Sequence, residues 1–181
     1  MVEEKLLILK FKLGNRDALC RIYEKYKNDL LKLAIALLND VNTAEDVVEE
    51  VFMAFAQSAA TIRINGNLKS YLTICVANKI RNTKRDRQRH ETSDIEESQG
   101  LVCQSKRPEQ WAMLNEEMEI LRDALALIPY EQREVLTLYM QGDITFKQIA
   151  KMQGASINTV QGRYRYGLNK LRSLLNGEME K

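Results

Sequence analysis

The residues best suited to recognition chemistry lie near the C-terminal end of the chain, where amide and guanidinium side chains recur at helical spacing. Asn158, Gln161 and Arg165 are three and four positions apart, which places them on one face of a helix. Asn, Gln and Arg carry the paired donors and acceptors that match base edges in the major groove of DNA. The pattern therefore predicts a helix that reads a base sequence, with a solvated basic helix of a bundle as the alternative.

The residues around this helix have the layout of a helix-turn-helix motif, from Thr145 to Tyr164. Ala150 is small enough to let two helices approach, Gly154 supplies the turn, and Val160 packs back against the first helix. Ser156 is expected to cap the second helix. An apolar stripe continues along that helix, comprising Val160, Tyr164, Leu168, Leu171 and Leu175.

A second basic segment lies in the N-terminal half, from Thr61 to His90, with eight Lys or Arg residues against the single acid Asp86. Its tail is polar almost all round. Arg63 and Tyr71 precede the tail and add a cation and an aromatic ring on which unstacked bases can lie. The alternatives are a solvated charged face for the tail and a core position for Tyr71.

Other kinds of chemistry have little support. His90 is the only histidine, and no Ser, Cys or carboxylate has an evident activating partner, so an enzyme is disfavoured. The dispersed glycines form no phosphate-binding loop. Cys20, Cys75 and Cys103 lack metal-site spacing, so we expect no metal or cofactor and buried, inert thiols. Reduced thiols and the lack of a membrane-length apolar run predict a cytoplasmic protein with no membrane insertion.

Helical periodicity must position these residues, and it runs through most of the chain. The first expected helix buries Leu6, Leu7, Leu9 and Leu13 and ends at Gly14. The second runs from about Asp17 to Leu38 along one apolar stripe. Thr43 or Asn42 is expected to cap the third, with Glu45 and Asp46 in its first turn. Its buried face comprises Val47, Val51, Phe52 and Phe55, and a fourth helix follows a turn at 64–67.

Residues 91–109 lack periodicity and are rich in acids, Ser and Gln, which indicates a flexible linker. Helical pattern resumes near Trp111 and restarts after Pro129, which suits the first turn of a helix. The predicted fold is therefore all-α, with small helical domains at 1–90 and 110–181 joined by a flexible acidic linker.

Taken in order, several segments resemble the sigma-70 family of bacterial RNA polymerase sigma factors, and specifically its small extracytoplasmic-function (ECF) group. Residues 43–52 and 71–78 are similar to region 2 of that family. Residues 128–136, Ile149-Ala150, Thr159-Val160 and Arg163 are similar to region 4. The resemblance implies a sigma region 2 bundle in the first domain and a sigma region 4 helix-turn-helix in the second.

The resemblance also implies a function: a specificity subunit that directs core polymerase to promoters and helps to open them. Bacterial core RNA polymerase and promoter DNA would be its partners, and an anti-sigma factor is a further partner that the family allows. The polymerase-binding residues would be Asp46, Glu49, Glu50 and Phe52. Those at the separated −10 strand would be Arg63, Asn67, Lys69, Tyr71, Asn78, Arg81, Lys84 and Arg85. Those at the −35 element would be Asn158, Thr159, Gln161, Gly162, Arg163, Arg165, Lys170 and Arg172.

Four positions depart from the family's usual pattern. Glu49 stands where Gln is common and Asn82 where Asp is common, and Gly162 and Gly167 replace the usual Ser and Ala. Each glycine is expected to weaken the recognition helix by roughly 1 kcal/mol relative to Ala.

Rival interpretations differ in how much of the chain they explain. A stand-alone helix-turn-helix regulator explains only the C-terminal half, and an RNA-binding protein would use both basic segments without promoter preference. A flexible linker of about 19 residues spans roughly 24 Å, whereas more than one DNA turn of about 34 Å separates the two promoter elements. We therefore hypothesise that the isolated chain binds promoters weakly and that polymerase holds its domains apart.

Overall fold

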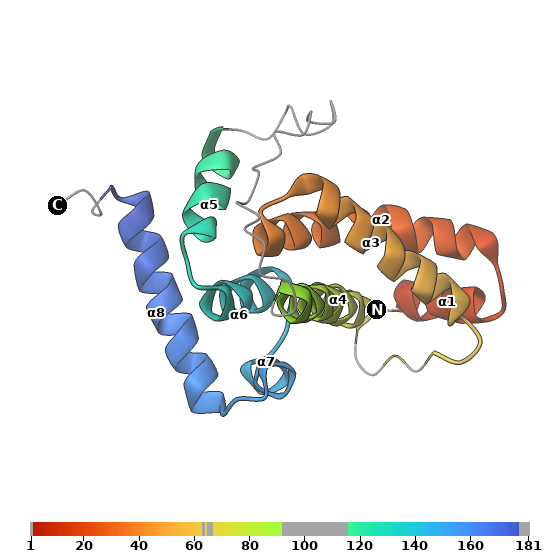
Figure 1. The fold of residues 1–181 in the computed structure, drawn as a ribbon. Helices are drawn as coiled ribbons and strands as arrows, with labels where there is room; N and C mark the ends of the chain where they lie inside the picture. Colours follow the sequence, from red (N-terminus) through yellow and green to blue (C-terminus); the bar gives the residue numbers. More distant parts are fainter. Residues whose placement is uncertain (1, 63, 65–66, 92–115, 178–181) are drawn as a thin grey trace.

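The computed structural model describes residues 2–62, 64, 67–91 and 116–177, and every regular element within these ranges is an α-helix (Figure 1). The N-terminal half contains α1 (Val2–Lys12), α2 (Arg16–Leu38), α3 (Val41–Gln57) and α4 (Leu68–Glu91). The C-terminal half contains α5 (Glu116–Ala126), α6 (Tyr130–Gln141), α7 (Phe146–Gln153) and α8 (Ile157–Leu175). The all-α prediction is confirmed.

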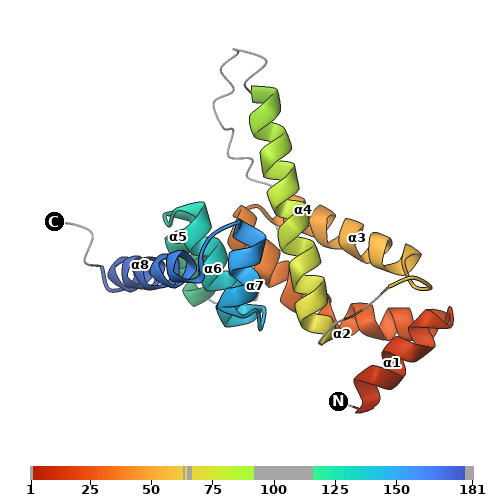
Figure 2. The same cartoon turned by 90° about the horizontal axis from the view of Figure 1, so that it is seen from below.

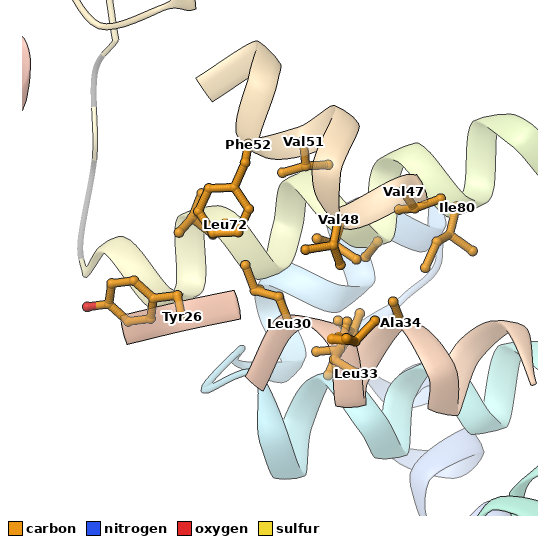
Figure 3. Packing of buried hydrophobic residues seen from close by; sticks show 14 of the residues in the cluster. Tyr26, Leu30, Leu33, Ala34, Val47, Val48, Val51, Phe52, Leu72 and Ile80 are labelled. Atoms are coloured by element: carbon orange, nitrogen blue, oxygen red, sulfur yellow. The ribbon is translucent and has the colours of Figure 1, made fainter. Parts of the chain in front are cut away.

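The N-terminal half is built around α2, α3 and α4, whose apolar stripes face one another (Figure 3). Leu30 and Leu33 of α2 meet Val48 of α3 in this core, and Leu72 and Ile80 of α4 close it. All five side chains are almost fully removed from water. Burial of each such side chain contributes about 1.5–3 kcal/mol, so these contacts position α3 and α4.

Short polar side chains set where the helices begin. Asn15 caps α2 by accepting the Ala18 N–H at 2.9 Å. Asp40 caps α3 by accepting the Thr43 N–H at 2.7 Å. The predicted cap at Thr43 or Asn42 is therefore wrong. Because α3 begins earlier than predicted, at Val41, its first turn contains no acidic residue.

The first helix forms as predicted but buries a different face. Leu7 and Phe11 are its buried side chains, and Phe11 stacks on Phe55 of α3 with ring centroids 4.4 Å apart. The other three leucines of the predicted stripe are exposed, namely Leu6, Leu9 and Leu13. Because leucines occupy adjacent positions, the apolar pattern alone did not determine which face of this helix is buried.

The C-terminal half contains the predicted helix-turn-helix in α7 and α8. Thr145 caps α7, and its backbone N–H donates to Gln148 Oε1 at 2.9 Å, which completes a capping box. Gly154 then turns the chain with a φ of 61°, a conformation that glycine adopts without strain. Ser156 caps α8, as predicted, and Pro129 occupies the N-cap position of α6.

The two halves pack directly against each other. Val135, Leu138 and Ile144 are buried in the same apolar cluster as the core of α2, α3 and α4. Figures 1 and 2 show α6 and α7 beside α4. Arg133 of α6 donates a hydrogen bond to the carbonyl of Leu37 at 3.1 Å. This bond joins α6 to the C-terminal end of α2.

Two further predictions concern other parts of the chain. The predicted linker lies outside the described residues, apart from Glu91 at the end of α4. Trp111 also lies outside the described residues. Within the described ranges, no helix is long and apolar enough to cross a membrane.

Candidate nucleic-acid interface

The predicted base-reading residues share the exposed face of α8. Asn158, Gln161 and Arg165 are all exposed, and α8 lies at the outer edge of the molecule in Figure 1. Ser156 Oγ accepts the Thr159 N–H at 3.0 Å, which fixes the helix start beside Asn158. The three side chains therefore project from the N-terminal turns of a capped helix, as major-groove reading requires.

The remaining predicted −35 residues fall into two groups. Thr159 and Arg172 are exposed, and Gly162 and Lys170 are partly exposed along the same helix. Arg163 instead points back into the motif, where it donates to Gln153 Oε1 of α7 at 2.6 Å. Arg163 thus ties α8 to α7 in this conformation.

Three aromatic rings pack together where α6, α7 and α8 meet, and only Tyr164 among them was expected. Tyr139 of α6 stacks on Phe146 of α7 with centroids 4.2 Å apart. Tyr164 of α8 packs edge-on against both rings, at 5.1 Å and 5.4 Å. Tyr139 and Phe146 have no periodic signal linking them to α8, so only the folded chain reveals this cluster.

The predicted −10 residues at the start of α4 contribute partly to structure. Asn67 Oδ1 accepts the Ser70 N–H at 2.6 Å and so caps the first turn of α4. Tyr71 is half-buried and packs at a tilt against Phe55, with centroids 6.3 Å apart. Burial, reinforced by Cys75, raises the pKa of Tyr71 to about 12. Arg63 lies outside the described residues.

Further along α4, Asn78 and Arg85 are exposed, but three predicted DNA-binding cations already have partners. Lys69 Nζ lies 3.4 Å from Asp29 and 3.8 Å from Asp143. Arg81 Nη2 donates to Glu134 of α6 at 2.8 Å. Lys84 Nζ lies 3.7 Å from the ring centroid of Tyr130 in α6. Burial lowers the pKa of Lys84, and repulsion from Arg133 lowers it further.

A cleft of about 340 Å³ lies where α4 meets the C-terminal half. Its walls carry both cations and carboxylates and comprise Arg81, Lys84, Arg85, Tyr130, Glu131, Glu134, Gln153 and Arg163. Glu134 was not among the predicted site residues, because its contact with Arg81, 53 positions away, forms only in the folded chain.

The predicted polymerase-binding residues lie on α3. Asp46, Glu49 and Glu50 are exposed, and Glu50 pairs with Lys79 of α4. Phe52 is only 6% exposed and packs edge-on against Tyr23, so its ring belongs to the core. Met53, which the sequence did not single out, is 62% exposed and one turn from Glu49. We call Asp46, Glu49 and Met53 the α3 surface.

The thiols differ from the expectation that they are buried. Cys20 is exposed, so the expectation is wrong for this residue, whereas Cys75 is half-buried. Cys103 lies outside the described residues. Within the described part of the chain, no three His, Cys, Asp or Glu side chains are grouped so that they could hold a metal ion.

Family models match both halves of the chain. Sigma-70 region 2 matches residues 22–90, and Sigma-70 region 4 matches residues 118–171. The chain is 25% identical over 146 residues to the ECF RNA polymerase sigma factor EcfG of Rhodopseudomonas palustris, covering 81% of this chain and 78% of EcfG. It is 24% identical over 181 residues to the ECF RNA polymerase sigma factor SigW of Bacillus subtilis, covering 94% of this chain and 96% of SigW.

Two solved structures are similar in fold across nearly the whole chain. The sigma factor RpoE of Bartonella quintana, solved with the anti-sigma factor NepR, has a TM-score of 0.62 and 21% identity, covering 99% of this chain and 96% of RpoE. CnrH, solved with the cytosolic domain of CnrY, has a TM-score of 0.65 and 19% identity, covering 96% of this chain and 97% of CnrH. With both regions present in order and relatives matched over most of their lengths, this chain belongs to the ECF group of sigma-70 RNA polymerase sigma factors.

Proposed function

We propose that this sigma factor binds bacterial core RNA polymerase through the α3 surface and engages promoter DNA through α4 and α8. In this division of labour, α8 reads the −35 element and α4 takes up the separated −10 strand. The polymerase supplies the chemistry of RNA synthesis, so the chain itself needs no catalytic residue or cofactor. Because transcription takes place in the cytoplasm, we place the protein there.

The exposed face of α8 is the observation that carries the proposal. Asn158, Gln161 and Arg165 are free of the packing that holds Arg163, and each has the geometry to pair with a base edge. Lys170 and Arg172 follow on the same helix and are suited to phosphate contacts. In the N-terminal half, the acids and Met53 of the α3 surface leave an exposed area for a protein partner.

Run-off transcription with purified core polymerase on a library of promoter fragments tests the proposal. We expect the protein to direct initiation to a discrete set of start sites. A variant combining Asn158→Ala, Gln161→Ala and Arg165→Ala should lose that selection. Lys10→Ala, which removes an exposed charge from α1, is the matched control and should retain it. Initiation without any selected site in the presence of the unaltered protein would contradict the proposal.

Copurification separates this function from that of a stand-alone regulator. A sigma factor should copurify with core polymerase, and a double variant of the α3 surface, Asp46→Lys with Glu49→Lys, should not. A stand-alone regulator would instead bind duplex DNA tightly without polymerase. RpoE of Bartonella quintana was solved in complex with the anti-sigma factor NepR, and this supports an anti-sigma factor as a third partner of this chain.

A further inference from the structure

Two adjacent residues of α6, Arg133 and Glu134, make polar contacts between the halves. Arg133 donates to the carbonyls at the ends of two helices, Leu37 of α2 at 3.1 Å and Leu125 of α5 at 3.3 Å. Cations stabilise helix C-termini, where backbone carbonyls lack partners. One side of α6 is therefore bonded to both halves of the protein.

Glu134 occupies the other side of α6 and is 1% exposed. Its Oε1 accepts from Arg81 Nη2 at 2.8 Å and from the Tyr130 hydroxyl at 3.1 Å. Its Oε2 accepts from Gln153 Nε2 at 2.8 Å. A buried carboxylate is stable when it is paired in this way, and Arg81 is the one cation among these donors, so separating α4 from α6 breaks an ion pair.

The same cleft is lined by four cations that were predicted to bind DNA, and three of them have partners within the protein. Arg81 also donates to the carbonyl of Met152 in α7, which leaves its guanidinium bonded on two sides. Lys84 lies over the Tyr130 ring, and Arg163 is bonded to Gln153. A nucleic acid strand would therefore have to compete with these internal partners for all three side chains.

Close packing extends the contact along α4. A Cβ added to Gly142, at the end of α6, would lie 2.6 Å from Thr73 Cγ2, so the chain approaches α4 closely there. Ser70 Oγ donates to the carbonyl of Asp143 at 3.4 Å. The contact therefore runs from the first turn of α4 to Lys84, along the segment proposed to take up the −10 strand.

We propose that this contact is an autoinhibitory latch, in which Glu134 occupies Arg81 in place of DNA. The inference rests on the proposed function, because it assumes that α4 engages single-stranded promoter DNA. In the latched state, α4 is turned toward α6 and α7. Release of Glu134 frees Arg81 and Lys84 together, so the chain acquires affinity for the strand only when its halves separate.

Neutralising Glu134 tests the latch in the full chain. The probe is a fluorescent single-stranded oligonucleotide of mixed sequence, and its affinity is measured by anisotropy. Glu134→Gln keeps the side-chain shape but removes the charge, and we expect about tenfold tighter binding, the size associated with losing one hydrogen bond to a charged group. Glu131→Gln is the matched control, since Glu131 lines the same cleft but is exposed. It removes an equal charge and should bind like the unaltered protein.

Two further measurements accompany the affinities. Small-angle X-ray scattering should show a larger radius of gyration for Glu134→Gln than for Glu131→Gln. In a chain that already carries Arg81→Ala, Glu134→Gln should add much less affinity, because the main cation that it releases is gone. Equal affinities and equal radii for the two glutamate variants would refute the latch.

A disulfide lock covers the case in which Glu134→Gln fails to fold. Ser70→Cys and Asp143→Cys are introduced into a chain whose three natural cysteines are replaced by serine. Oxidation should close the latch and abolish oligonucleotide binding, and reduction should restore it. Full binding by the oxidised protein would exclude an inhibitory role for the contact.

Run-off transcription in parallel distinguishes the two levels of the proposal. If the unaltered protein selects start sites but neither the glutamate variants nor the lock changes binding, the latch is wrong and the sigma function stands. If the unaltered protein selects no start site, the proposed function fails, and the latch fails with it.

Discussion

The proposed function divides individual residues of α8 into those that would read bases and those that would contact phosphates. Arg165→Ala should relax the choice of one −35 base while leaving other positions unchanged, because a bidentate base contact discriminates by about 1–3 kcal/mol. Lys170→Ala should weaken binding to all sequences alike. Competition binding on a set of single-base promoter variants, with polymerase present, measures both effects. Equal losses on promoter and scrambled DNA for both variants would show that the roles are misassigned.

The two glycines of α8 should respond oppositely to alanine. Nothing lies within 4 Å of a Cβ added to Gly162, so Gly162→Ala should stabilise the protein by about 1 kcal/mol. At Gly167 the added Cβ would lie 3.0 Å from Leu136 Cδ1, so packing strain should cancel or reverse that gain. Thermal unfolding of the two variants makes the comparison. A higher melting temperature for Gly167→Ala than for Gly162→Ala would contradict it.

Thiol reactivity separates two of the cysteines. Burial raises the pKa of Cys75, so at any given pH a smaller fraction is the reactive thiolate. Cys20 is exposed and should react first with an aromatic disulfide reagent near pH 8. Variants that keep one of these two cysteines each make the comparison. Equal rates at pH 8 would show that Cys75 is open to solvent.

At the scale of the elements, α3 has a buried residue, Phe52, directly beside Met53 of the proposed docking surface. Phe52→Ala should cost about 3–5 kcal/mol of stability, because the cavity would lie in the core. Met53→Asp should leave the melting temperature nearly unchanged and weaken polymerase binding by about tenfold, the effect of losing one well-packed interface residue. Calorimetry and a polymerase pull-down measure the two properties. If Met53→Asp bound polymerase normally, the α3 surface would have to be redrawn.

Periodicity predicted most of the helices and the recognition face, because local spacing and caps determine both. The cap at Ser156 and the turn at Gly154 are signals of this local kind. Helical periodicity did not predict that α2 is buried on two sides. Ile35 and Ala36 lie off the expected stripe yet are buried, and Ala36 belongs to a cluster with residues of α5, α6 and α8. Such contacts depend on segments far away in the chain, which a single helix pattern does not encode.

At the scale of the whole molecule, buried apolar residues of both halves share one cluster, so the two regions pack against each other. The full chain should therefore unfold on heating in a single cooperative transition, with equal calorimetric and van't Hoff enthalpies. Two resolved calorimetric peaks would show that the halves are independent.

The hypothesis that the free chain binds promoters weakly rested on the reach of a linker. The contact between α4 and α6 now offers a second physical reason, since the cations of α4 have internal partners. Neither the pairing of Arg81 with Glu134 nor the bond from Arg133 to Leu37 could be predicted, because no sequence signal connects such distant positions.

The α3 surface is exposed while Arg81 and Lys84 of α4 have partners in the C-terminal half, so the proposed latch implies an order of events. We expect polymerase to bind the α3 surface in a first bimolecular step whose rate does not depend on Glu134. Separation of the halves then follows as a slower rearrangement within the encounter complex, whose rate does not rise with polymerase concentration. In stopped-flow traces, Glu134→Gln should accelerate this second phase alone.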